Sequence, residues 1–334
     1  MRIAVIGAGA IGSLVAAYLK LKGKEVSLIG TPDSVKAIRQ NHLEVSGARG
    51  KFKISIDIDI GLRFHPGLVI LATKTQDLEK AIRDNFSFLQ KAIILTTQNG
   101  IQADGIAAQY IPVENIVSSI IMFGATYLEP GQVVHNFEGP WIIGKISGGN
   151  DEKVIEIVRL LENIFSVIAT EEIRGMKYLK VFVNASNCIP AILGMSMQEA
   201  FADLDTSRIS VAIWKEGLEI VTQAGINLVS LPDFPLERLT RITSLPSAEA
   251  AKIFSSIMVN LSKEPLYGSI LQSIKRKKTS EIDYINGEFT VLAEKNNLKA
   301  SLNEKLVEMV HKVETTGKFF SRQELLKETA GLFS

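Results

Sequence analysis

The feature that most constrains this chain is a glycine-rich segment near its start, Gly7-Ala8-Gly9-Ala10-Ile11-Gly12. It follows a short apolar run, Arg2–Ile6, and opens a helical pattern, Ile11–Leu21. G-x-G-x-x-G between a strand and a helix is typical of the turn that starts a dinucleotide-binding βαβ unit. Its glycines permit a tight turn, a close approach of backbone to pyrophosphate, and close packing of helix on strand. We therefore predict a dinucleotide site here; a structural turn without a ligand is the alternative.

Apolar runs and helical patterns alternate through the first half of the chain. Further strands are expected at 25–29, 68–72 and 92–96, and helices at 76–88, 102–109 and 151–165. Runs that are apolar throughout are typical of parallel strands covered on both faces. This alternation predicts an α/β fold with a Rossmann-type doubly wound parallel sheet. The stretch 117–145, punctuated by Pro-Gly and Gly-Pro, predicts an antiparallel extension.

Strand signals disappear after Glu171, and apolar residues then recur with helical spacing in 174–192, 206–224, 247–261, 280–295 and 302–315. We predict a dinucleotide-binding domain at 1–170 and a mostly helical substrate and catalytic domain at 171–334, with the active site in the cleft between them. With 46% apolar and 22% charged residues, the composition is that of an ordinary globular protein. Helical second domains can bury partner surfaces, so a homodimer stays open.

Charge and cysteine content narrow the function classes. Lys and Arg total 37 against 36 Asp and Glu, a net charge of +1 that argues against a nucleic-acid binder. No apolar run reaches the ~18 residues of a membrane span, so no membrane partner is expected. Cys188 is the only cysteine, which excludes an intrachain disulfide and a Cys-rich metal cage. These features favour a cytoplasmic protein without a metal site.

The residue type at the end of the second strand usually indicates whether a dinucleotide site prefers NAD or NADP. NAD sites usually place Asp or Glu there, whereas an arginine nearby accommodates the 2′-phosphate of NADP. Here the position is Thr31, followed by Pro32, a pair typical of a helix N-cap and first helical residue. Asp33 lies beyond that end and is suited to stabilising the first helical turn. Without a carboxylate to repel a 2′-phosphate, we predict NADPH as the preferred cofactor and keep NAD open.

Two more loops follow predicted strands, at the carboxyl edge where ligands of open α/β sheets bind. Lys74 could attract a phosphate or a substrate carboxylate, and Asn99 could hydrogen-bond ribose or substrate. Each could equally be an exposed loop residue.

In the second half, Lys180, Asn184 and Asn187 are spaced i, i+4, i+7 and share one face of an apolar helix. A lysine whose pKa is lowered by burial could protonate the oxygen of a carbonyl that receives hydride. The asparagines could donate to and accept from a hydroxy-keto substrate. Lys177 is the alternative donor, and a solvated helix face is the alternative interpretation. Further along, Glu281 could simply belong to the first turn of a helix capped by Ser280 or Thr279.

Together these segments resemble the ketopantoate reductase (2-dehydropantoate 2-reductase) family over nearly the whole length. The resemblance is carried by the segments GAGAIG at 7–12, Lys74-x-Gln76, Gln98-Asn99-Gly100, Glu129-Pro130-Gly131, Lys180-x-x-x-Asn184, Ser269-Ile-Leu-Gln and Ser280-Glu-Ile-Asp-Tyr-Ile-Asn-Gly287. The family reduces 2-dehydropantoate to pantoate with NADPH, on the route to pantothenate and coenzyme A.

The resemblance implies roles for individual residues. Lys180 would donate the proton, while Asn184 and Ser269 would hold the substrate. Asn99 would touch cofactor and substrate, and Glu281 would anchor the nicotinamide–substrate end. Lys74 and Ala125 would contact the cofactor.

The sequence departs from the family at three positions. Thr31 replaces the usual arginine, Cys188 replaces the second helix asparagine, and Ser273 replaces an aspartate. Asn187 lies one step before Cys188 and could substitute for the missing asparagine. A reductase of another branched 2-oxo acid is therefore an alternative, and a non-catalytic NAD(P)-binding sensor is a second one.

Overall fold

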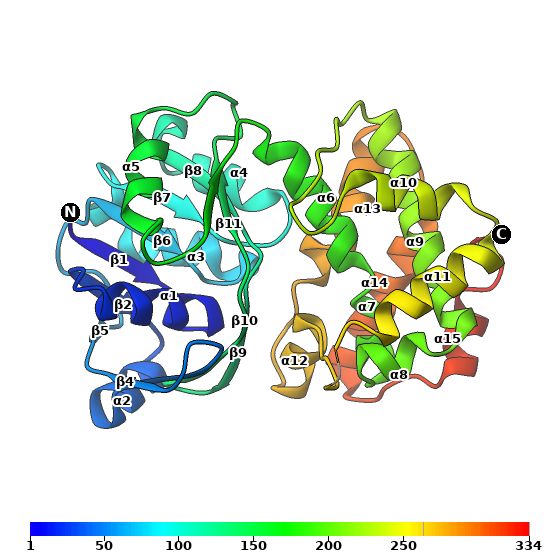
Figure 1. Cartoon of the computed structure of the whole chain (residues 1–334), viewed down its shortest axis with the longest axis horizontal. Helices are drawn as coiled ribbons and strands as arrows, with labels where there is room; N and C mark the ends of the chain where they lie inside the picture. The colour runs from blue at the N-terminus through cyan, green and yellow to red at the C-terminus, as the bar shows by residue number, and fades with distance from the viewer. Residues whose placement is uncertain (263, 334) are drawn as a thin grey trace. The chain divides into compact units, whose positions relative to one another are not determined.

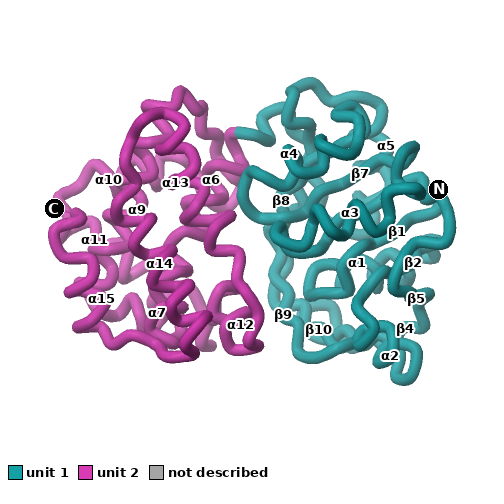
Figure 2. The backbone as a smooth tube through the Cα atoms, turned by 180° about the vertical axis from the view of Figure 1, so that it is seen from behind, with its two compact units in different colours: residues 1–174 teal, residues 175–334 magenta. Residues whose placement is uncertain are grey.

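The computed structural model describes residues 1–262 and 264–333. The chain divides into two compact units, Met1–Arg174 (unit 1) and the part from Gly175 onward (unit 2), coloured separately in Figure 2. The division falls a few residues after the predicted boundary, in the first turn of a helix that begins at Ile173.

Unit 1 is built on an eight-stranded sheet in the order β12-β11-β8-β7-β6-β1-β2-β5 (Figure 1). Its strands are β1 (Ile3–Ile6), β2 (Val26–Ile29), β5 (Asp57–Asp59), β6 (Leu68–Leu71), β7 (Ile93–Thr96), β8 (Ile116–Ile121), β11 (Trp141–Gly144) and β12 (Val167–Ala169). The strands from β8 to β5 run parallel, while β11 is antiparallel to β8 and parallel to β12. The predicted Rossmann-type parallel sheet is confirmed.

Helices cover both faces of this sheet and give two apolar cores. The helices of unit 1 are α1 (Ala10–Leu21), α2 (Pro32–Asn41), α3 (Thr75–Leu89), α4 (Gln102–Ala108), the 3-10 turn η1 (Val113–Asn115) and α5 (Glu152–Leu161). Side chains of α1, α2 and α5 pack into one core, and those of α3 and α4 pack into the other. The alternation of buried strands with amphipathic helices therefore produces the expected layers, and the strands end together at one edge.

The stretch 117–145 forms more than an antiparallel extension of this sheet. Its strands β9 (Gly124–Glu129) and β10 (Gln132–Phe137) join β3 (Leu43–Gly47) and β4 (Phe52–Ile54) in a separate sheet, ordered β4-β3-β10-β9. The Tyr18 hydroxyl lies 2.9 Å from Nδ1 of the buried His135, which ties β10 to α1. The sequence prediction missed this sheet because β10 pairs in parallel with β3, a partner far away along the chain.

Unit 2 is helical, as predicted. Its elements are α6 (Ile173–Ala185), α7 (Cys188–Leu193), α8 (Met197–Phe201), α9 (Leu204–Gln223), α10 (Leu236–Ser244), α11 (Ser247–Val259), α12 (Ser269–Lys275), η2 (Ile282–Tyr284), α13 (Asn286–Lys295), α14 (Ser301–Thr316) and α15 (Arg322–Glu328). Buried rings fix the packing: Trp214 of α9 meets Phe254 of α11, and Phe182 of α6 meets Phe289 of α13, with centroids 5.2 and 4.9 Å apart.

Two predicted helices are interrupted. The helix expected over 174–192 breaks between α6 and α7, just before Pro190, whose backbone nitrogen has no hydrogen to donate to the preceding turn. The helix expected over 280–295 starts instead as the 3-10 turn η2 and becomes α-helical only at Asn286. Both interruptions lie at residues that were predicted to form the site.

Candidate active site

The glycine turn has the geometry that its spacing predicts. Gly7 adopts φ +117°, and a β-carbon there would lie 2.6 Å from the backbone nitrogen of Thr73. A β-carbon at Gly12 would lie 1.9 Å from the Gly7 carbonyl oxygen, whereas one at Gly9 would meet no atom within 4 Å. Gly7 and Gly12 are thus needed for packing, while Gly9 leaves open space beside the turn. Open space at the second glycine is what this motif needs for the close approach of a pyrophosphate.

The start of α1 adds an electrostatic reason for a phosphate to bind. Gly9 is the N-cap residue and offers no side chain, and the first turn contains no acidic residue. Uncapped N–H groups and the positive end of the helix dipole attract anions. The residues between these glycines, Ala8, Ala10 and Ile11, are small or apolar and add no negative charge.

The turns carrying Lys74 and Asn99 lie at the same edge. Lys74 is the N-cap residue of α3, three residues after the end of β6, and Asn99 follows β7, the neighbouring strand. Gln98 joins the two turns, because its Nε2 donates to the carbonyl oxygens of Leu71 and Thr73, each at 2.9 Å. Thr73 is also the residue packed against Gly7. The structure thus brings together three turns that the sequence placed far apart, which we call the dinucleotide edge.

The bridging role of Gln98 does not follow from the sequence, where the residue is only one member of a short motif. The signal available in the sequence was a polar side chain at the end of an apolar strand.

Ala125, the other predicted cofactor contact in unit 1, lies on β9 of the second sheet, paired with His135. It packs against the core that includes side chains of α1.

The Thr31 hydroxyl acts as predicted, accepting from Ser34 N at 3.4 Å as the N-cap of α2. The neighbouring strand β5 carries Asp59, a charged residue, next to the end of β2. Gly30 N donates to the carbonyl oxygen of Asp59 at 3.0 Å. The Asp59 carboxylate pairs with Arg63 at 2.7 Å and with Arg39 at 3.5 Å. Two exposed guanidinium groups therefore lie next to the end of β2, a feature that needs the β2–β5 pairing to be known.

In unit 2, Lys180 and Asn184 lie one turn apart on α6, and both are half-buried. Burial lowers the pKa of Lys180 from its usual 10.5 to about 8. An ammonium with such a pKa is a better proton donor near neutral pH than an exposed lysine. Lys177, the alternative donor, is only 3% exposed.

Asn187 lies in the break between α6 and α7, at the N-cap position of α7. A β-carbon added at Gly268 would lie 3.3 Å from both Cβ and Cγ of Asn187. Gly268 is the N-cap of α12, whose first residue is Ser269. The break in the helix therefore brings Asn187 to the start of α12, beside a residue predicted to hold the substrate.

Cys188 does not take the place of an exposed asparagine. Its side chain is fully buried, and burial raises the pKa of its thiol to about 12 despite a side-chain hydrogen bond with Asn286. Asn286 in turn donates to Oδ1 of Asn303 at 2.9 Å. Cys188 thus belongs to a buried polar network of unit 2. Ser273 is buried too, and its hydroxyl donates to the carbonyl oxygen of Ser269 at 2.9 Å.

Glu281 is the N-cap residue of η2, and its carbonyl oxygen accepts from Tyr284 N at 3.0 Å. The Ser280 hydroxyl accepts from Ile282 N at 3.3 Å. The predicted cap by Ser280 or Thr279, with Glu281 in the first helical turn, is wrong, because Glu281 itself is the N-cap residue and the element is a 3-10 turn.

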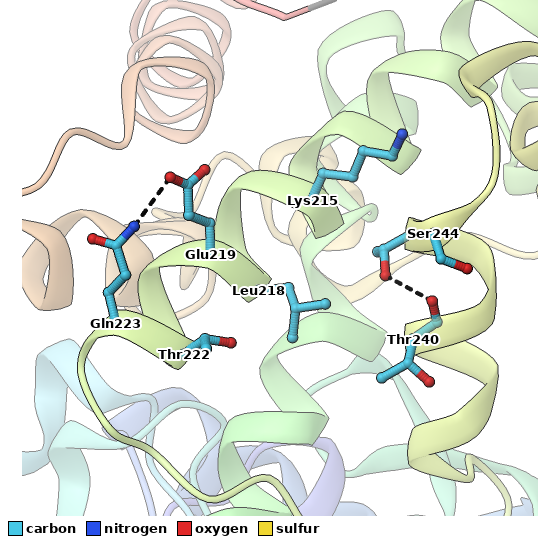
Figure 3. A pocket seen from close by; sticks show the side chains of 8 residues that line it. Lys215, Leu218, Glu219, Thr222, Gln223, Thr240 and Ser244 are labelled. Carbon is cyan, nitrogen blue, oxygen red and sulfur yellow. Dashed lines mark hydrogen bonds between the residues drawn. The ribbon is translucent and has the colours of Figure 1, made fainter.

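A groove in unit 2 lies apart from these residues. It runs between α9 and α10, and Figure 3 shows polar side chains around it, with Gln223 donating to Glu219 at 3.1 Å. None of the predicted site residues lines it. In the described residues there is also no cluster of His, Cys, Asp and Glu that could hold a metal ion, and none of the described helices is long and apolar enough to cross a membrane.

Comparison with known proteins identifies this arrangement. The family described as "Ketopantoate reductase PanE/ApbA" matches residues 3–148, and "Ketopantoate reductase PanE/ApbA C terminal" matches residues 172–314. The chain belongs to the ketopantoate reductase family. It is therefore an NAD(P)-dependent oxidoreductase that acts on a small keto acid. The family resemblance predicted from the sequence motifs is confirmed.

Individual relatives agree with this assignment. The 2-dehydropantoate 2-reductase of Pyrococcus horikoshii is 32% identical over 324 residues, covering 95% of this chain and 99% of the relative. Among solved structures, a D-mandelate dehydrogenase with NADH and anilino(oxo)acetate is 25% identical, with a TM-score of 0.79 over 95% of this chain and 99% of its own. A PanE/ApbA family ketopantoate reductase from Ralstonia eutropha JMP134 shares the fold, with 20% identity and a TM-score of 0.80 over 94% of this chain and 99% of its own.

Proposed function

We propose that this protein reduces 2-dehydropantoate to pantoate with NADPH, a step toward pantothenate and coenzyme A in the cytoplasm. The observation that carries the proposal is the half-buried Lys180, whose pKa is about 8, one turn before Asn184 on α6. A lysine in this state can deliver a proton to a forming alkoxide at neutral pH. The name of the Pyrococcus horikoshii relative supports 2-dehydropantoate as the substrate.

In this proposal the dinucleotide edge of unit 1 holds the cofactor, which supplies the hydride for the carbonyl carbon. The uncapped N-terminus of α1 faces the pyrophosphate beside Gly9, and Lys74 adds a positive charge near the phosphates. Asn99 touches the nicotinamide end and the substrate. Ala125 provides an apolar contact from β9.

Unit 2 supplies the groups that act on the substrate. Lys180, as the ammonium, polarises the carbonyl oxygen and then donates its proton to it. Asn184, Asn187 and Ser269 hold the hydroxyl and carboxylate groups, and Asn187 replaces the family asparagine because it lies at the start of α12. Glu281 anchors the nicotinamide–substrate end. We also propose that the protein works as a homodimer, which sedimentation analysis of the whole chain can test.

A preference for NADPH is supported by Arg39 and Arg63, which meet the Asp59 carboxylate next to the end of β2. Guanidinium groups bind phosphate through paired N–H donors, so they can replace the arginine that the family has in place of Thr31. NADH remains the alternative cofactor, since the Asp59 carboxylate that meets both guanidinium groups can itself accept a hydrogen bond from a ribose hydroxyl.

One observation favours a second substrate. The D-mandelate dehydrogenase of similar structure was solved with NADH and anilino(oxo)acetate, and we propose on this ground an aromatic 2-oxo acid as the alternative substrate. The departure at Ser273 points the same way.

Turnover assays decide between these proposals. NADPH and NADH oxidation is followed with 2-dehydropantoate and, in parallel, with the 2-oxo acid that corresponds to mandelate. Rapid NADPH oxidation with 2-dehydropantoate supports the first proposal. Turnover of the aromatic acid alone supports the second, and cofactor binding without turnover of any 2-oxo acid would point to the sensor instead.

A further inference from the structure

The segment that carries Glu281 is short and would not hold its shape alone. It consists of the 3-10 turn η2, between α12 and α13, and its first residues precede any regular helix. Ser280 is 1% exposed, so its backbone N–H needs a partner inside the protein. The segment therefore depends on contacts from another element.

Helix α14 provides these contacts on both sides of Glu281. Glu314 accepts a hydrogen bond from Ser280 N at 2.6 Å through Oε1. Its other oxygen lies 3.0 Å from Nδ1 of His311, and Nε2 of His311 lies 2.8 Å from Oδ1 of Asp283. We call this set of four residues, Ser280, Asp283, His311 and Glu314, the imidazole clamp. One imidazole thus links residues that flank Glu281.

The helix that carries the clamp is itself fixed. The side chain of Glu216 on α9 accepts from Leu302 N and Asn303 N, each at 2.9 Å, at the first turn of α14. Such a carboxylate satisfies N–H groups that a helix start leaves without partners. The clamp therefore connects η2 to the packed core of unit 2.

The clamp needs His311 in its charged form. A neutral imidazole has one N–H donor, so it can serve only one of two carboxylates, whereas the imidazolium serves both. Partial burial opposes this charge, but the hydrogen bonds with Asp283 and Glu314 outweigh it and raise the pKa of His311 above 6.5. Asp283 from η2 and Glu314 from the same helix are the charged groups that act on this imidazole among the described residues.

We propose that His311 is a positioning residue for the reduction: with Glu314 and Asp283 it holds η2 so that Glu281 is correctly placed. This inference rests on the proposed role of Glu281. Deprotonation of His311 would release one carboxylate and loosen the segment. The protein would then lose activity through the position of Glu281 rather than through the loss of a group that touches the substrate.

A double-mutant cycle tests the proposal in the whole chain. His311→Ala should lower kcat/KM for 2-dehydropantoate by about tenfold, since it removes charge-assisted hydrogen bonds. In a Glu281→Gln background the same substitution should change kcat/KM by less than about twofold, because residues that act through one group are not additive. An equal loss in both backgrounds would overturn the proposal. Full activity of Glu281→Gln alone would instead show that the proposed role of Glu281 is wrong.

Two further measurements keep the test clear. Hydrogen exchange should be faster at the Ser280 amide in His311→Ala, and unchanged protection there would contradict the clamp. If His311→Ala does not fold, His311→Gln retains an uncharged N–H donor group and should show a smaller change in the same direction. The matched control is Lys305→Ala on the same helix, which loses ion pairs with Glu308 and Glu328 at 3.1 and 2.9 Å but should keep wild-type activity.

Discussion

Gly12 approaches Gly7 so closely that a β-carbon on Gly12 would lie 1.9 Å from the carbonyl oxygen of Gly7. Real β-carbons do not come so near to backbone atoms, so the turn exists only with glycine at this position. A β-carbon on Gly9, in the same turn, would meet no atom within 4 Å. Two glycines of one motif thus have different roles. Gly12 allows the turn to pack closely, and Gly9 leaves space in which a ligand can bind.

This contrast gives a paired prediction. Gly9→Ala should fold with wild-type thermal stability but bind NADPH at least about tenfold more weakly, because the methyl group enters the space for the pyrophosphate. Gly12→Ala should lower the free energy of unfolding by about 1–3 kcal/mol or more, the usual cost of overpacking. Thermal unfolding and NADPH fluorescence titration measure the two effects. Equal behaviour of the two variants would refute the division of roles.

Lys180 is the residue whose loss should affect the chemistry most. Lys180→Ala should lower kcat by ~10²–10⁴, the usual contribution of a general acid. Binding of NADPH should change little, because the dinucleotide edge belongs to unit 1. The comparison variant is Lys177→Ala, and steady-state kinetics of both are needed. A larger loss of kcat in Lys177→Ala would move the proton donor to Lys177.

The lowered pKa of Lys180 predicts how the reduction depends on pH. The lysine donates only as the ammonium, and its pKa is about 8. As pH rises through this value the charged fraction falls, so kcat/KM for the keto acid should decline by about tenfold per pH unit above it. Below about pH 7 this group should cause no further change. A profile that stays flat to well above the pKa would show that Lys180 is not the donor.

Local features of the site were predictable from the sequence, and features that depend on distant pairing were not. The glycine turn and the Thr31 cap are determined by neighbouring residues, so their spacing predicted them. The closeness of Asn187 to Gly268 required the break between two helices and the packing of α7 on α12. The link from Gln98 to Thr73 likewise needed the pairing of β6 with β7.

The arginines beside β2 are the clearest example of a feature that depends on the pairing of distant segments. Arg63 follows β5, a three-residue strand that the sequence patterns did not predict. Only the pairing of Ile29 with Asp59 brings Arg63 near the end of β2. The residue type at position 31 therefore did not indicate that two arginines lie beside the end of β2.

The last prediction concerns these arginines and the choice of cofactor. Arg63→Ala should raise KM for NADPH by about 10–100-fold, the loss of a charge-assisted hydrogen bond to phosphate, while KM for NADH stays within about twofold. The reason is that only NADPH carries the 2′-phosphate. Arg63 forms an ion pair with Asp59, whose carbonyl oxygen accepts a hydrogen bond from Gly30 N at the end of β2. Arg83→Ala is the matched control, because Arg83 forms an exposed ion pair with Glu79 on α3. Initial rates with each cofactor measure the effect. If Arg63→Ala weakened both cofactors equally, the guanidinium would not be the group that distinguishes them, and if NADPH bound normally, the 2′-phosphate would have another partner.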